Sequence, residues 1–167
     1  MKIIVEVIKA LNRASTRHIV VGGVATLFHG HTRFTADLDL ILDLHSPQVK
    51  DGLVALKELG FSPVNPVELM DILDSKKRQV WIQEKNALVL TLNRKSNPFE
   101  VIDIFLESPI DFQEMYSRSS TVSIDDALVT VCSIKDLIFM KEIAGRDKDL
   151  LDLVQLYKIR DSLNKSS

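Results

Sequence analysis

Two aspartates separated by one leucine, Asp37 and Asp39, stand in a segment from 36 to 44 in which acidic and aliphatic residues alternate. Residues i and i+2 of a β-strand point to the same face, so the two carboxylates are expected within a few ångströms of each other. At a separation near 5 Å and an effective dielectric of about 20, two such charges repel by roughly 3 kcal/mol. The spacing therefore predicts a cation here. Mg²⁺ is the natural candidate because it prefers carboxylate oxygens and completes its shell with water and phosphate.

A third acid, Asp103, lies in the segment from 99 to 106, on the strand face that also holds Val101 and Phe105. A carboxylate among apolar neighbours is costly to bury unless a cation or hydrogen bonds neutralise it. Three strand-borne aspartates that meet at one point would form a two-metal site for in-line phosphoryl displacement, where one ion activates the attacking oxygen and the other stabilises the leaving group. The predicted catalytic residues and metal ligands are therefore Asp37, Asp39 and Asp103.

A glycine pair, Gly22-Gly23, follows a short β-branched run from 18 to 21 and precedes a stretch compatible with a helix. A glycine turn that leads into a helix presents backbone N–H groups to an anion, and the absence of Cβ lets a phosphate approach closely. Arg33 and Thr35 stand just before the acidic strand, where either can contact the same phosphates. The predicted nucleotide-binding residues of this region are Gly22, Gly23, Arg33 and Thr35.

The stretch from Val21 to Leu40, VGGVATLFHGHTRFTADLDL, resembles the signature of the DNA polymerase β-like nucleotidyltransferase superfamily. Within it, the chain is similar to the minimal bacterial nucleotidyltransferases of the AbiEii/MenT toxin group, in which a downstream lysine is followed by Ala-Gly-Arg-x-Lys-Asp. The corresponding run here extends from Lys141 to Asp149. One departure is Gly23, where many superfamily members have a serine that contacts a terminal phosphate.

The resemblance implies a mixed sheet with helices packed on it and Mg²⁺ or Mn²⁺, two ions in all, held by the three aspartates. It also implies that Asp103 is the base for the acceptor hydroxyl and that Lys141 contacts the nucleotide. On the residues alone, Lys141 is equally explained as a surface lysine lying along a helix. Ordinary charges at a helix start would likewise explain Lys148, Asp149 and Asp152.

Together, the chemistry and the resemblance predict metal-dependent transfer of a nucleoside monophosphate from an NTP to an acceptor, with pyrophosphate as the leaving group. This reaction depends on positioning and charge neutralisation more than on a covalent nucleophile. The acceptor is expected to be RNA, such as tRNA, or protein, in keeping with a toxin–antitoxin role and a cognate partner protein, because a short chain has little room for a large acceptor-binding domain. Two alternatives stay open: an antibiotic nucleotidyltransferase acting on an aminoglycoside or lincosamide, and a nucleotide-binding or antitoxin-like protein with little turnover.

Hydrophobic periodicity gives the elements that must position these residues. Trp81 is interpreted as a core residue of a strand, and the basic clusters at 75–78 and 94–95 as solvated turns or guides for a polyanion. The order of elements predicts an α+β fold, an α/β sandwich with a mixed sheet of the polymerase β-like type, helices packed on it and a helical C-terminus. Helices are expected over 1–13, 24–28, 46–59, 134–144 and 150–157, and strands over 18–21, 36–44, 80–82, 88–93 and 99–106.

The 167 residues are 46% hydrophobic and 26% charged, with a formal net charge of −2. This composition fits one soluble globular domain over 1–167 and excludes a disordered or strongly basic protein. Cys132 is the only cysteine, which excludes an internal disulfide and a thiolate metal site. Neither a signal-peptide pattern nor an apolar stretch near the roughly 20 residues of a membrane span is found, so we expect a cytoplasmic protein with no membrane partner.

Overall fold

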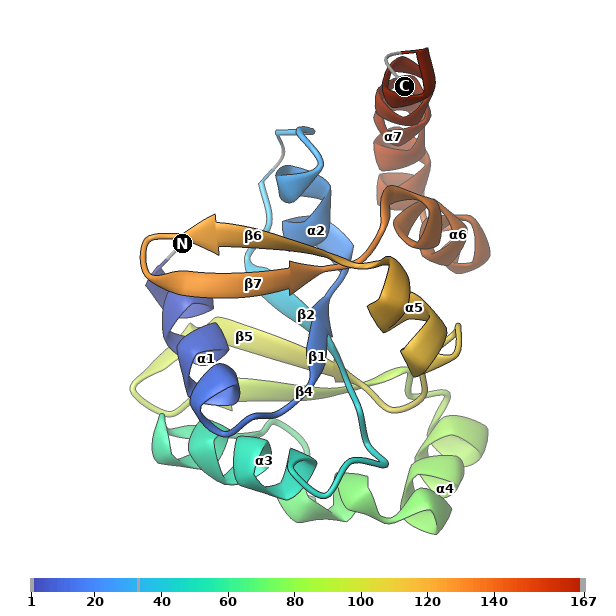
Figure 1. The fold of residues 1–167 in the computed structure, drawn as a ribbon. Helices are drawn as coiled ribbons and strands as arrows, with labels where there is room; N and C mark the ends of the chain where they lie inside the picture. The colour runs from blue at the N-terminus through green and yellow to red at the C-terminus, as the bar shows by residue number, and fades with distance from the viewer. Residues whose placement is uncertain (1, 33, 166–167) are drawn as a thin grey trace.

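The computed structural model describes residues 2–32 and 34–165, in which seven strands form one mixed sheet in the order β3-β4-β5-β2-β1-β7-β6 (Figure 1). The pairs β2–β5 and β1–β7 are parallel, and the other neighbours are antiparallel. The strands are β1 (His18–Val20), β2 (Asp37–Leu42), β3 (Phe61–Pro63), β4 (Val89–Arg94), β5 (Asn97–Phe105), β6 (Ser120–Ile124) and β7 (Ala127–Val131). The helices are α1 (Lys2–Arg13), α2 (Gly22–Phe28), α3 (Val49–Glu58), the 3₁₀ helix η1 (Leu69–Leu73), α4 (Ser75–Lys85), α5 (Phe112–Arg118), α6 (Ile134–Ala144) and α7 (Asp147–Lys165).

The predicted α+β class is confirmed, and so are all five predicted helices and four of the five predicted strands. One prediction is wrong: residues 80–82 belong to helix α4 rather than to a strand. Three apolar residues in a row are too short a pattern to distinguish the two states. The decisive local signal is Asp74, whose carboxylate accepts hydrogen bonds from the N–H groups of Lys76 at 2.8 Å and Lys77 at 3.4 Å and so caps the helix.

The aliphatic faces of the two central strands form the middle of the core. Leu38 and Leu40 of β2 lie beside Ile102 and Ile104 of β5, and each of these side chains is at most 1% exposed. Helices α1 and α3 pack against each other and against the sheet. Burial of each such side chain contributes about 1.5–3 kcal/mol, so this face fixes the register of β2 on β5 and thereby the arrangement of the opposite face.

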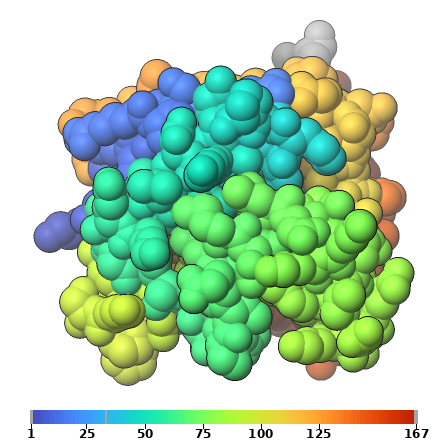
Figure 2. Space-filling model, turned by 90° about the horizontal axis from the view of Figure 1, so that it is seen from below, coloured from blue at the N-terminus to red at the C-terminus, as the bar shows by residue number. Residues whose placement is uncertain are grey.

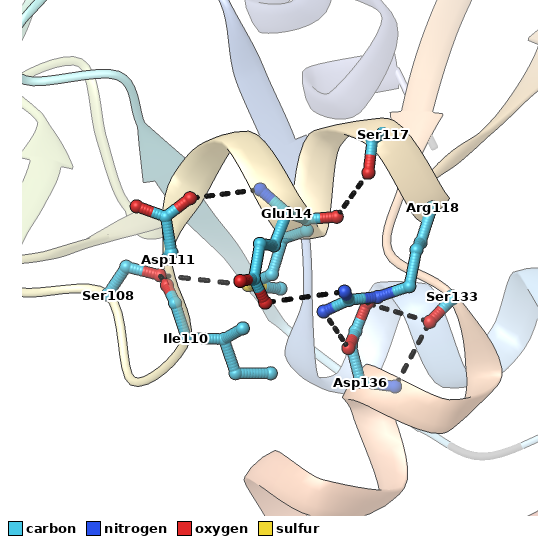
Figure 3. A network of polar contacts seen from close by, with 9 residues as sticks. Ser108, Ile110, Asp111, Glu114, Ser117, Arg118, Ser133 and Asp136 are labelled. Atoms are coloured by element: carbon cyan, nitrogen blue, oxygen red, sulfur yellow. Dashed lines mark hydrogen bonds and ion pairs between the residues drawn. The ribbon is translucent and has the colours of Figure 1, made fainter.

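Helix α6 is anchored at its first turn to α5 (Figure 3). The Ser133 hydroxyl caps the helix by accepting a hydrogen bond from the Asp136 N–H at 3.1 Å. The buried Asp136 carboxylate accepts two hydrogen bonds from Arg118, one from Nε at 3.1 Å and one from Nη2 at 2.8 Å. A two-pronged contact of this kind fixes orientation as well as position, so α5 determines the direction in which α6 leaves the sheet.

Helices α3, η1 and α4 lie at the centre of the face of the molecule seen in Figure 2, where the atoms are teal and green. In the parts of the chain that the structure describes, no helix combines the length and the apolar character needed to cross a membrane.

Candidate active site

Three aspartates lie on one face of two neighbouring parallel strands. The register of β2 on β5 sets Asp39 directly beside Asp103, and Asp37 beside Val101. Since side chains alternate along a strand, Asp37 and Asp39 share the face opposite to Leu38. All three carboxylates are half-buried. The sheet therefore brings the three predicted catalytic side chains onto one surface, although Asp103 is more than 60 residues from the other two in sequence.

The glycine pair packs directly against Asp39. Gly22 adopts a left-handed backbone with φ +61°, and a Cβ at this position would stand 2.0 Å from the Asp39 Oδ2 atom. The Gly23 N–H donates a hydrogen bond to the same oxygen at 3.3 Å, and the Val21 N–H donates to the Asp39 backbone carbonyl at 3.0 Å. Only a residue without a side chain fits between the start of α2 and this carboxylate, so the glycine turn positions Asp39 as well as facing the site.

Asp39 carries a strongly perturbed carboxyl group. Burial raises its pKa to about 6, and the neighbouring negative charges of Asp103 and Asp37 act in the same direction, whereas the Gly23 N–H and the Lys148 ammonium act against it. Each of these carboxylates therefore makes the ionisation of Asp39 less favourable. A cation bound on this face would remove that cost.

Asp103 is held by a strand neighbour. Thr91 of β4 donates a hydrogen bond from its hydroxyl to Asp103 Oδ1 at 2.6 Å. Burial raises the pKa of Asp103, the charge of Asp37 raises it further, and the Thr91 hydroxyl with the cations Lys148 and Arg146 lowers it. With Oδ1 engaged by Thr91, the second carboxylate oxygen is the one left to accept a proton from an incoming hydroxyl.

Two cationic side chains from the junction of α6 and α7 lie near the aspartates. Gly145 ends α6 in a left-handed conformation with φ 59°, and its N–H donates to the Lys141 carbonyl at 3.0 Å. The next residues, Arg146 and Lys148, act electrostatically on both Asp39 and Asp103. Neither cation was among the predicted site residues, although both belong to the run from Lys141 to Asp149 that carries the family resemblance.

Lys141 lies in a different setting from the one expected. Its side chain is 6% exposed, and its ammonium lies 3.2 Å from Asp149 Oδ1 and 2.6 Å from Asp152 Oδ2. Arg146 Nε donates to Asp149 Oδ2 at 2.6 Å, and His31 Nε2 lies 3.5 Å from Asp152 Oδ1. In this structure the ammonium therefore holds α6 to α7, and contact with a nucleotide remains a prediction.

Of the remaining predicted residues, the structure describes Thr35, Gly22 and Gly23 but not Arg33. Thr35 is half-buried just before β2, and its hydroxyl lies 3.5 Å from the Asp37 carbonyl, at the limit of a weak hydrogen bond. Gly22 and Gly23 lie at the site, as described above. Arg33 lies outside the described residues, so its predicted phosphate contact is not placed.

A divalent cation fits the donor set of this face. Within residues 2–32 and 34–165, no three Asp, Glu, His or Cys side chains are gathered closely enough to be a ready-made metal cluster. Even so, Asp37, Asp39 and Asp103 supply the oxygen donors that Mg²⁺ and Mn²⁺ prefer, and their mutual repulsion is the one that a cation relieves.

A family model matches nearly the whole chain. Residues 1–164 match the family described as "Nucleotidyltransferase of unknown function (DUF6036)". Among curated protein sequences, none matches the chain significantly.

Solved structures share the fold. The lincosamide antibiotic adenylyltransferase LnuA, bound to lincomycin, superposes with a TM-score of 0.63 at 14% identity, over 95% of this chain and 96% of the other. ANT(2″)-Ia in complex with adenylyl-2″-tobramycin gives 0.58 at 12% identity, over 99% and 97%. An antigenic nucleotidyltransferase-like protein from Paracoccidioides brasiliensis gives 0.58 at 16% identity, over 93% and 74%.

Proposed function

Because the chain belongs to the DUF6036 family of nucleotidyltransferases, we propose that it transfers a nucleoside monophosphate from an NTP to an acceptor hydroxyl, with pyrophosphate as the leaving group. The observation that carries this proposal is the register that sets Asp39 beside Asp103, against a glycine turn that leads into α2. Membership of a family of transferases also favours an enzyme over a non-catalytic nucleotide-binding or antitoxin-like protein.

Asp37 and Asp39 are the proposed ligands of the nucleotide-associated divalent cation, and Asp103 is the proposed ligand of a second. When bound, such ions neutralise the triphosphate and polarise the phosphorus under attack. The protein's own contribution is to hold three carboxylates on a rigid pair of strands, with Gly22 packed on one of them so that its position does not vary.

Asp103 is the proposed general base. Its free carboxylate oxygen accepts the proton of the acceptor hydroxyl as the hydroxyl oxygen bonds to the α-phosphorus. The bond between the α-phosphorus and the bridging oxygen to the β-phosphate breaks, and pyrophosphate leaves with that electron pair. The raised pKa of Asp103 suits this role because a carboxylate of higher pKa is the stronger base.

Arg146 and Lys148 are the proposed counter-charges for the triphosphate. Both already act on the charges of Asp39 and Asp103 from the turn between α6 and α7. A triphosphate brought to the aspartates therefore meets two cations. Thr35, Arg33 and the glycine pair Gly22-Gly23 are proposed to complete the phosphate contacts. The glycine pair would contribute by close backbone approach, because the Gly23 N–H donates to Asp39.

For the acceptor, we favour a small hydroxylated molecule. The chain and LnuA cover 95% and 96% of each other, so a lincosamide antibiotic adenylyltransferase needs no longer chain than this one. The short length of the chain is therefore equally compatible with a small acceptor.

RNA or protein is the second candidate acceptor, supported by a separate observation. Three exposed lysines, Lys57, Lys77 and Lys95, line one groove of about 950 Å³ beside α3, η1 and α4. Glu68 and Asp71 line the same groove, and Lys77 is ion-paired with Asp71. Two of the lysines come from the basic clusters at 75–78 and 94–95. A toxin–antitoxin role with a cognate partner protein rests on the sequence resemblance to the AbiEii/MenT group.

The test is release of pyrophosphate by purified protein supplied with a labelled NTP, Mg²⁺ and, in separate reactions, tRNA, protein, a lincosamide and an aminoglycoside. We expect label transfer to one acceptor class, loss of transfer in Asp39→Ala, and retention in Asp51→Ala, which removes an exposed carboxylate from α3. Transfer that persists in Asp39→Ala would show that the metal site is assigned wrongly.

A further inference from the structure

Helix α7 has two apolar faces, of which α6 covers only one. Leu153 and Leu156 are buried against the fold together with Asp149 and Asp152. On the other side of the same helix, Leu151 is 73% exposed and Val154 is 52% exposed. In Figure 1 the helix stands clear of the sheet with α6 alongside it. Helices that are apolar on opposite sides normally lie between two partners.

The exposed apolar surface continues from α7 onto α6. The Tyr157 hydroxyl hydrogen-bonds to Glu142 and so marks one seam between the two helices. Val154 stands one helical turn before Tyr157, and Phe139 one turn before Glu142, so each lies on the side of its helix that borders this seam. Phe139 is 44% exposed, and the surface also includes exposed Ile143 and Leu150. Neighbouring exposed apolar side chains rimmed by charges are typical of an interaction site.

The charges beside this surface identify the partner. Asp147 stands four residues before Leu151, and Lys158 stands four residues after Val154, so the four side chains follow one line along the helix at spacings of four, three and four. Asp147 and Lys158 are both exposed, and neither makes an ion pair with any residue of 2–32 or 34–165.

This line is complementary to itself. An antiparallel pairing that sets Leu151 opposite Val154 of the partner subunit also sets Asp147 opposite Lys158 of the partner subunit, and the two-fold axis repeats both contacts. We propose that the chain forms a homodimer through this antiparallel pairing of α7 helices. A second copy of the chain presents the order acid, leucine, valine, lysine in reverse, which is the order that this face matches.

The pairing is independent of the proposed reaction and is tested by sedimentation equilibrium from about 1 to about 100 µM, the range for an interface of modest area. We expect a reversible dimer. Leu151→Glu and Val154→Glu should each raise the dissociation constant at least about tenfold, because each buries a charge twice per dimer. Leu88→Glu is the matched control, since Leu88 is 72% exposed just before β4, and it should leave the constant unchanged.

Charge reversal tests the geometry. Asp147→Lys and Lys158→Asp alone should each raise the dissociation constant roughly threefold or more, since each sets like charges opposite one another at two places. The double variant restores opposite charges and should return close to the wild-type constant. A protein that stays monomeric over the whole range, a dimer indifferent to Leu151→Glu and Val154→Glu, or a double variant no better than the single ones would each overturn the proposal.

Discussion

Gly22 and Asp39 are in such close contact that a Cβ on the glycine would lie 2.0 Å from the carboxylate oxygen and 2.5 Å from the carboxylate carbon. Replacing Gly22 by Ala is therefore expected to displace Asp39 or the start of α2. The expected loss is about 2–5 kcal/mol of unfolding free energy, from a left-handed backbone and an overpacked contact together, with loss of nucleotidyl transfer. Urea unfolding and pyrophosphate release measure the two effects.

Gly145→Ala separates the two causes. Gly145 has almost the same φ, 59° against 61°, but a Cβ there would meet nothing nearer than 3.8 Å. This variant should lose only about 1–2 kcal/mol, the cost of the backbone conformation alone. Equal losses in the two variants would mean that the contact with Asp39 is unimportant.

Asp39 should make the unliganded protein less stable as the pH rises. Burial and the charges of Asp103 and Asp37 raise its pKa from 3.8 in a model peptide to about 6. Between these values the folded state binds more protons than the unfolded state, so the unfolding free energy falls as the pH increases through this window. Asp39→Asn removes that penalty and should stabilise the protein at pH 7 by roughly 1–3 kcal/mol without divalent metal.

The measurement is a series of urea unfolding curves from about pH 4.5 to 7.5 in the presence of a chelator. The quantity compared is the difference in unfolding free energy between wild type and Asp39→Asn. The difference in unfolding free energy should shrink towards pH 4.5, because there the folded wild type is mostly protonated at Asp39. Added Mg²⁺ should raise the melting temperature of the wild type more than that of Asp39→Asn. A variant less stable than wild type at every pH would contradict the charge argument.

Loss of the Lys141 side chain is expected to lower the unfolding free energy of the protein. Lys141→Met leaves Asp149 and Asp152, whose side chains are 2% and 3% exposed, without their shared cation, and should cost roughly 2–4 kcal/mol. Lys135→Met, which removes an exposed lysine from the same helix, should change the unfolding free energy by less than about 0.5 kcal/mol.

Neutralising the two aspartates tests the cause of that loss. Combining Lys141→Met with Asp149→Asn and Asp152→Asn removes the buried negative charges and should recover much of the stability. If Lys141→Met is as stable as wild type and only NTP affinity falls, the lysine contacts the nucleotide directly, as the family resemblance implies.

The sequence pattern predicted those elements whose structure depends mainly on residues close together in the chain. The alternation around Asp37 and Asp39 gave the strand and its face, and the glycine pair gave the turn beside it. The register of β2 on β5 depends on burial of leucines and isoleucines from distant segments, so the sequence could suggest but not measure the closeness of Asp39 to Asp103.

The contacts that could not be predicted from the sequence depend on how distant elements pack together. The pairing of Lys141 with Asp149 and Asp152 depends on how α6 packs on α7 after the turn at Gly145, and no periodicity reveals that angle. The same turn carries Arg146 to the aspartates. Residues 80–82 were assigned to a strand because the capping carboxylate at Asp74 lies outside the apolar run itself.

Arg118 should be important for the stability of α6. Its guanidinium is the main partner of the Asp136 carboxylate, which is 4% exposed, so Arg118→Met leaves a nearly buried charge with only the Ser133 hydroxyl and the helix start to support it. We expect a loss of roughly 1–3 kcal/mol in urea unfolding. Arg160→Met removes an exposed pair with Asp161 and should cost less than about 0.5 kcal/mol. Similar losses in both variants would show that burial of Asp136 does not matter.

Substitution of Asp103 should lower turnover while leaving nucleotide binding nearly unchanged. It lies on a different strand from Asp37 and Asp39, and Thr91 holds one of its oxygens, so its proposed tasks are the second cation and the acceptor proton. Asp103→Asn keeps the shape of the side chain and removes its charge and basicity. NTP binding measured by calorimetry should stay within a few-fold of wild type, while turnover falls by about 10²- to 10⁴-fold, as is typical when a general base is lost.

Asp37→Asn is the variant with which Asp103→Asn is compared. The residue belongs to the pair proposed to hold the nucleotide-associated cation, so its loss should weaken metal-dependent NTP binding and turnover together. Thr91→Val, which frees Asp103 Oδ1 without removing the base, should reduce turnover less than Asp103→Asn and shift its pH dependence to higher pH, because the hydroxyl lowers the pKa of Asp103. A fall in NTP affinity in Asp103→Asn as steep as in Asp37→Asn would mean that the three aspartates bind one shared ion cluster, and the division of roles between the two strands would be wrong.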